Sequence, residues 1–127
     1  MKKSEVRALD ELFSKRERLL SGGYCRRCKK CVGYSNLDTA HCHSRTIHNT
    51  RWDRKNVAAL CRSKETGSGC HSLLDLHPNI KHEFFRELLG KDEYDKLYER
   101  SLVLKPHIDV KALKQELKEE IGILERG

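Results

Sequence analysis

A chain of 127 residues, 37% hydrophobic and 35% charged, is long enough for one domain but can bury only a small apolar core. No apolar run is long enough to cross a membrane, and the chain opens on a charged amphipathic stretch, so we expect no membrane partner and no secretory leader. We therefore expect a cytoplasmic protein, in which six cysteines favour a metal site over disulfides.

The net charge of +7 is concentrated near the N-terminus. Residues 1–36 hold 10 Lys and Arg against 4 Asp and Glu, whereas residues 78–127 hold 10 against 11. A basic region beside the first cysteines predicts contacts with phosphates, and so a nucleic-acid partner. The alternative is a basic surface that serves only solubility.

The N-terminal part of the chain, residues 1–22, is predicted to be a basic amphipathic helix over 4–20. Ser4 is a suitable N-cap, and Gly22-Gly23 would end the helix. Apolar residues recur at helical spacing at Val6, Leu9, Leu12, Phe13 and Leu19. The Lys- and Arg-rich outer face either contacts DNA or is a solvated surface.

A cysteine knuckle follows this helix. Cys25 and Cys28 are separated by two residues, a spacing that directs both sulfurs at one tetrahedral zinc ion. Cys31 repeats the spacing, so Cys28 with Cys31 is the other possible pair. We expect the first pair, with Cys31 as a bystander and Cys42 as a small buried residue.

Short strands are predicted at 32–34 and 37–43, joined by Ser35-Asn36. A polar loop over 46–55 leads to a third strand at 56–61. The segment between Cys61 and Cys70 is a loop by composition, longer than the two-residue spacer of an ordinary second knuckle.

The C-terminal part, residues 78–127, is predicted to be helical, after a short helix that begins at Cys70 and His71. Pro78 suits the first position of the next helix, which would end at Gly90, and another helix is expected over 92–104. Asp109 would cap a last helix with one apolar stripe. That helix either packs on the core of a monomer or pairs with a copy of itself in a homodimer.

Four cysteines have the layout of a treble-clef zinc site: two pairs separated by a β-hairpin-length segment, with the last cysteine at a helix start. They are Cys25, Cys28, Cys61 and Cys70. Four thiolates around Zn²⁺ leave no open position for water, so this site would be structural.

Inside this framework lie polar residues that a structural zinc ion does not need. They are Asp38, His41, His43, Asn56 and His71. A phosphodiesterase requires a divalent metal ion to neutralise the developing charge and a base to deprotonate water. A histidine suits the base, and an Asn can orient its ring or bind the metal. Each histidine alone is more often structural; their positions within the cysteine framework favour a nuclease.

The chain resembles the phage branch of the His-Asn-His (HNH, ββα-metal) endonucleases, the phage recombination nucleases of the NinG (Rap) type. The matching segments are Tyr24-Cys25-x-x-Cys28, Ala40-His41-Cys42-His43-Ser44-Arg45, Arg51-Trp52-Asp53-x-x-Asn56, Cys61, Cys70-His71 and Leu89-Gly90-x-x-x-Tyr94-x-x-Leu97. They span about residues 24–100.

The resemblance implies a role for each residue of the motif. His41 would be the general base, Asn56 the central Asn and His71 the histidine that binds a catalytic Mg²⁺ or Mn²⁺ ion. Arg45 would clamp a phosphate, and Trp52 would pack beneath the loop.

Two positions differ from the family pattern. Ala40 stands where many members have a metal ligand, so Asp38 or His43 would take that role. Because the second knuckle is longer, His77 could replace His71.

We therefore expect an α+β fold: a treble-clef, ββα-metal core over 23–77 with a structural zinc ion, flanked by an N-terminal helix and C-terminal helices. The expected function is metal-dependent hydrolysis of DNA in phage recombination or processing. The alternative is a non-catalytic, zinc-stabilised module that binds nucleic acid through its basic N-terminal third, and a weaker one is an adaptor that binds proteins through its last helix.

Overall fold

The computed structural model describes residues 1–62, 69–104 and 107–127. It is a mixed α+β structure with a two-stranded sheet and, within the described residues, six α-helices. The expected α+β class is therefore confirmed. None of the described helices is both long enough and apolar enough to span a membrane.

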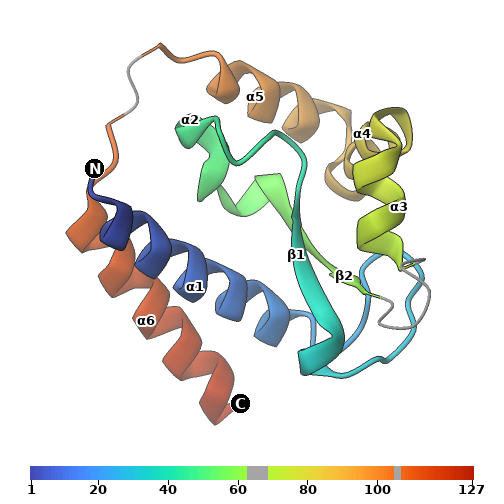
Figure 1. Ribbon diagram of the computed structural model, residues 1–127, viewed down its shortest axis with the longest axis horizontal. Coiled ribbons are helices and arrows are strands. Elements are labelled where there is room, and N and C mark those ends of the chain that lie inside the picture. Colours follow the sequence, from blue (N-terminus) through green and yellow to red (C-terminus); the bar gives the residue numbers. More distant parts are fainter. Residues whose placement is uncertain (63–68, 105–106) are drawn as a thin grey trace.

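The sheet lies at the centre of the molecule (Figure 1). Strand β1 (Leu37–His41) pairs antiparallel with β2 (Val57–Cys61), with Leu37 opposite Cys61 and His41 opposite Val57. Helices α1 (Lys3–Leu20) and α6 (Val110–Arg126) lie on one side of the sheet, and α3 (Cys70–Leu76) and α4 (Pro78–Leu89) lie on the other (Figure 1).

The first four residues of β2 (Val57–Cys61) are all apolar because two apolar clusters cover the strand. Ala58, Ala59 and Leu60 are fully buried against β1, α3, α4 and α5 (Lys91–Ser101). Val57 belongs to the second cluster, which joins α1 to α6 and to Trp52. Both faces of β2 are therefore covered, as its continuous apolar run indicates.

Helices α1 and α6 run side by side in the same direction (Figure 1). Leu9 and Phe13 of α1 pack against Leu117 of α6 and are almost completely buried. The apolar stripe of the last helix is thus used within the chain. Asp109 caps α6 as expected, since its side chain accepts a hydrogen bond from the Ala112 N–H at 3.0 Å.

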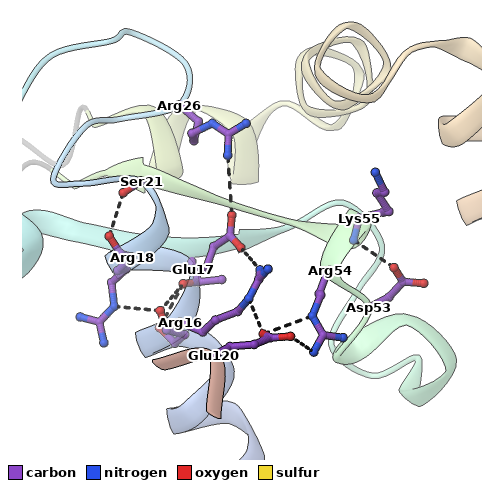
Figure 2. Close-up of polar contacts among 11 residues, drawn as sticks. Arg16, Glu17, Arg18, Ser21, Arg26, Asp53, Arg54, Lys55 and Glu120 are labelled. Atoms are coloured by element: carbon purple, nitrogen blue, oxygen red, sulfur yellow. Dashed lines mark hydrogen bonds and ion pairs between the residues drawn. The ribbon is translucent and has the colours of Figure 1, made fainter. Parts of the chain in front are cut away.

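An ion-pair network fastens α6 to the rest of the molecule (Figure 2). The Glu120 carboxylate accepts hydrogen bonds from Arg16 of α1 at 2.8 Å and from Arg54, just before β2, at 2.6 Å. Arg16 also pairs with the buried Glu17 at 3.1 Å, and Arg26 of the knuckle lies 4.0 Å from the same carboxylate. The network therefore links both terminal helices to the knuckle.

The expected strand at 32–34 is wrong. The backbone N–H groups of Val32 and Gly33 both donate to the Gly23 carbonyl, at 3.0 and 3.1 Å, and Gly33 has φ 85°. This close approach of two glycines turns the chain into a single 3₁₀ turn at Tyr34–Asn36. The partner of β1 is β2 instead.

Other boundaries also differ from expectation. Strand β1 ends at His41. The Cys42 N–H still donates to the Asn56 carbonyl at 2.8 Å, but the Asn56 N–H donates to the Asp53 carbonyl at 2.9 Å and so does not return the bond to β1. The 46–55 loop contains the short helix α2 (His48–Arg51), followed by a 3₁₀ turn at Arg54–Asn56. Helix α1 begins at Lys3, with Lys2 rather than Ser4 as its N-cap.

The remaining boundaries lie near the predicted ones. Helix α5 ends at Ser101, before the predicted 104. Helix α4 has Pro78 in its first turn and Gly90 after its end, as predicted. Most of the loop between Cys61 and Cys70, and the chain break at Pro106, lie outside the described residues.

Candidate active site and metal centre

Four cysteine side chains meet beside the sheet. The Sγ atoms of Cys25, Cys28, Cys61 and Cys70 all lie within 4.8 Å of one another, so the four can hold a metal ion. The first two come from the knuckle, the third ends β2 and the fourth begins α3. The structure thus brings together the four cysteines that the spacing selects, and it has no disulfide among the described residues.

The knuckle is built by backbone hydrogen bonds. The Cys25 N–H donates to the Lys30 carbonyl and the Lys29 N–H donates to the Cys25 carbonyl, both at 3.0 Å. Lys29 adopts φ 66°, the left-handed conformation that closes the turn. The Arg26 N–H then fastens the turn to β2 through the Ala59 carbonyl at 2.9 Å. Cys31 is exposed and lies outside the cluster.

The cluster has the electrostatics of a cation site. Burial raises the pKa of Cys25, but hydrogen bonds from the backbone of Cys28, Cys61 and Arg27 outweigh it and lower the pKa to about 7. Burial, together with the neighbouring thiols, raises the pKa of Cys61 to about 12 and also raises that of Cys70. One thiolate therefore opposes the ionisation of the next, and a divalent cation would remove this repulsion.

A cavity of about 460 Å³ opens between α1 and β1. Asp38, His41, Arg45 and His71 all line it. Its other wall belongs to α1, through Asp10, Glu11, Phe13, Ser14 and Arg18. Four of the predicted site residues, from β1, the following loop and α3, thus face one space.

His41 is held as a neutral imidazole at the end of β1. Burial, reinforced by the positive charge of Arg45, lowers the pKa of His41 to about 4. A hydrogen bond to the backbone of Arg51 acts in the opposite direction. A neutral imidazole keeps a lone pair on one ring nitrogen, which can accept a proton.

His71 lies between two carboxylates. Its Nδ1 is 3.0 Å from Oδ2 of Asp38, and its Nε2 is 3.2 Å from Oδ2 of Asp75. Asp75 was missed from the sequence, although it follows His71 by four residues on one helix, the spacing that places two side chains on the same face. Arg62 also pairs with Asp38, at 3.2 Å.

Asn56 is fully buried and contacts backbone rather than an imidazole ring. Its side-chain oxygen accepts from the His43 N–H at 2.7 Å, and its amide donates to the His43 carbonyl at 3.1 Å. These two hydrogen bonds fix the backbone at His43, two residues after His41. Asn56 is therefore a positioning residue for the histidine, and it does not line the cavity.

Two of the alternative ligands are not part of the cavity lining. The His43 ring packs near His82 and Tyr98, with ring centroids 5.6 and 6.1 Å away. His77 is exposed at the junction of α3 and α4. Of the ligand candidates, Asp38 and His71 are the pair that the fold brings together.

Asp10 of α1 was also missed, and it organises the loop that follows β1. Its Oδ1 accepts from Arg51 Nε at 3.0 Å and from the Trp52 indole at 2.9 Å. Its Oδ2 accepts from Arg51 at 2.6 Å and from Arg45 at 2.9 Å. Burial raises the pKa of Asp10, but these hydrogen bonds outweigh it and hold the pKa below its ordinary value.

Comparisons with protein-family models, with curated proteins and with solved structures give no match for this chain.

Proposed function

We propose that this protein is a metal-dependent endonuclease of the HNH (ββα-metal) type that hydrolyses DNA phosphodiester bonds. The observation that carries the proposal is the cavity in which His41, Asp38, His71 and Arg45 meet. A base, a carboxylate–imidazole pair and a cation facing one space are the groups that this hydrolysis needs. A role in phage recombination or DNA processing rests on the sequence resemblance alone.

The arrangement of elements supports a ββα-metal core of treble-clef type. Strands β1 and β2 pair, α3 follows them, and the cysteine cluster joins the knuckle, the end of β2 and the start of α3. Zn²⁺ fits four thiolates whose sulfurs are this close, and its role would be structural. The cluster would therefore hold α3, with His71, against β1, with Asp38 and His41.

His41 would act as the general base. Its free ring nitrogen takes a proton from water as the water oxygen attacks phosphorus, and the bond from phosphorus to the leaving sugar oxygen breaks. The Asn56 amide holds the loop that follows His41 through its two hydrogen bonds to the His43 backbone. A pKa of about 4 keeps the imidazole neutral, and so able to accept a proton, throughout the neutral range.

Asp38 and His71 would hold the catalytic ion, and Asp75 would accept a hydrogen bond from the other ring nitrogen of His71 and so orient the ring. A carboxylate oxygen and an imidazole nitrogen form a mixed donor pair that suits Mn²⁺ as well as Mg²⁺. An ion held there would take the place of the Asp38–His71 hydrogen bond. When bound, it would neutralise charge on the phosphate and on the leaving oxygen.

Arg45 would bind the substrate phosphate. Its side chain is 57% exposed and is held by Asp10 at 2.9 Å, so it reaches the cavity in a defined direction while keeping donors free.

The test is nicking of supercoiled plasmid by the wild-type protein and by His41→Ala, each with Mg²⁺, with Mn²⁺ and with EDTA. We expect metal-dependent cleavage by the wild type and a loss of at least about a hundredfold in rate for the variant, the usual contribution of a general base. His77→Ala is the matched control, because it removes an exposed histidine outside the cavity, and it should cut at the wild-type rate.

Each other result has a definite meaning. A His41→Ala variant that cuts as fast as the wild type would show that His41 is not the base. Equal losses of cleavage rate in His41→Ala and His77→Ala would indicate that His77 replaces His71 as the metal-binding histidine, because the second knuckle is longer. Salt-dependent DNA binding without cleavage of plasmid or branched DNA by the wild type would favour a zinc-stabilised binding module.

A further inference from the structure

The far end of the cavity is formed by Arg18, a residue of α1 that lies outside the motif region. It lines the same space as His41, and it follows Asp10, which holds Arg45, by eight positions on the same helix. At a rise of 1.5 Å per residue this separation is about 12 Å along α1. The cavity therefore has one arginine near each end, with His41, Asp38 and His71 also in its lining.

Arg18 is held in place by two contacts that leave its charge uncompensated. Its guanidinium carbon lies 4.3 Å from the centroid of the Tyr34 ring, and its Nε donates to the Ser14 carbonyl at 3.3 Å. Figure 2 shows its side chain pointing away from the network of Arg16, Glu17 and Glu120. An arginine stacked on an aromatic ring keeps outward donors and loses little rotamer entropy on binding.

The two ends of the cavity differ in how their cations are satisfied. Arg45 and Arg51 share the Asp10 carboxylate. In contrast, no ion pair among the described residues includes Arg18, although most arginines near it are paired with carboxylates. A guanidinium fixed in a cleft without an acidic partner is suited to bind an anion from outside the protein.

We propose that Arg18, stacked on Tyr34, is a second phosphate-binding subsite that grips the DNA strand away from the scissile bond. The inference rests on the proposed nuclease function and deepens it. Because Arg18 lies eight residues beyond Asp10 on α1, a rise of about 12 Å, the phosphate at Arg18 would be a different one from that at Arg45. Tyr34, 37% exposed, presents its free ring edge beside that strand.

The experiment is equilibrium binding of a labelled DNA duplex to the zinc-loaded protein with no Mg²⁺ or Mn²⁺ added, so that no cleavage competes, over about 50–200 mM salt. Arg18→Gln should bind about fivefold to tenfold more weakly at the low-salt end and reduce the slope of log affinity against log salt by about 0.9, the value for one phosphate contact. Arg18→Lys should keep the slope. Tyr34→Leu should also keep it while weakening binding by about twofold to fivefold, through loss of the stacking contact.

Arg86→Gln is the matched control. Arg86 is stacked on Tyr94 at 4.9 Å and does not line the cavity, so this variant removes the same charge and the same kind of contact elsewhere. We expect no change in its salt slope. In the cleavage assay, Arg18→Gln should raise KM by the factor lost in binding and leave kcat unchanged, because the contact is equal in the ground and transition states.

The outcomes separate this inference from the proposed function. An unchanged salt slope for Arg18→Gln, or an equal loss for Arg86→Gln, would overturn the subsite while leaving the nuclease intact. A wild-type protein that neither binds nor cuts DNA would overturn the proposed function itself. A slope that falls for Arg18→Gln alone would establish the subsite even if cleavage needed a different DNA form.

Discussion

Replacing Asp10 by Asn tests whether α1 organises the loop of the candidate site. The carboxylate accepts four hydrogen bonds, from Arg45, from Trp52 and twice from Arg51. Asn keeps one oxygen, which can still accept from Arg51 Nε and Trp52, but its amide N–H groups would face the guanidinium groups at the Oδ2 position. Hydrogen bonds to a charged group contribute about 1.5–3 kcal/mol each, and two of them are lost.

The expected cost is close to that of one such bond rather than two. Arg45 is 57% exposed and can turn to water, so its bond is worth little, whereas Arg51 is 14% exposed and would keep an unpaired charge. We expect a loss of about 2–3 kcal/mol in the free energy of unfolding at pH 7. For a chain of this size, that corresponds to a fall of about 10 °C in Tm.

The measurement is urea and thermal unfolding of the zinc-loaded protein, followed by circular dichroism. Asp95→Asn is the matched control, since Asp95 makes an exposed helical pair with Lys91 at 3.0 Å and should cost less than about 0.5 kcal/mol. In a double-mutant cycle, Asp10→Asn and Arg51→Gln should be strongly non-additive. If Asp10→Asn were no more destabilising than Asp95→Asn, the Asp10 contacts would not organise the loop and the reasoning would be refuted.

Two further predictions concern the cysteine cluster and the ion-pair network. The purified protein should hold one zinc ion per chain. A strong chelator, or Cys25→Ser, should remove the ion and abolish the cooperative unfolding transition. Cys31→Ser should retain both the ion and the transition, as measured by metal analysis and calorimetry. Burial raises the pKa of Glu17 above its ordinary value of 4.5, so its stabilising contribution is full below that pH and is lost as pH rises through the folded-state pKa. Glu17→Gln should therefore be neutral or stabilising at pH 7. In contrast, Glu120→Gln removes the carboxylate that Arg16 and Arg54 share and should cost about 1–2 kcal/mol in denaturant unfolding.

The cysteine cluster was the part of the site best predicted from the sequence. Two pairs at the right separation specify which sulfurs can meet, because a tight turn can direct its cysteines only at a nearby point. The choice of Cys25 over Cys31 as the partner of Cys28 also agrees with the structure. Helices with a continuous apolar stripe were also predicted well: α4 begins at Pro78 and ends just before Gly90, and α6 begins after its Asp109 cap, as expected.

The side-chain contacts across elements could not be predicted in this way. A sequence without an alignment carries no signal that Asp10 of α1 meets Arg51, because the two are distant in the chain and either could be a solvated surface charge. The same holds for Asn56, whose partner is a backbone loop rather than the ring of His41. The strand predicted at 32–34 fails for a related reason: a short apolar run does not reveal the contact between Gly23 and Gly33.

The N-terminal helix is therefore better understood as a wall of the candidate site than as a flanking element. One face of α1 buries Leu9 and Phe13 against α6, and another lines the cavity through Asp10, Ser14 and Arg18. Since α6 packs along α1, it stabilises that wall from behind. The sheet and α3 alone would present His41 on an open surface, and the paired terminal helices convert that surface into a cleft lined by Arg45 and Arg18.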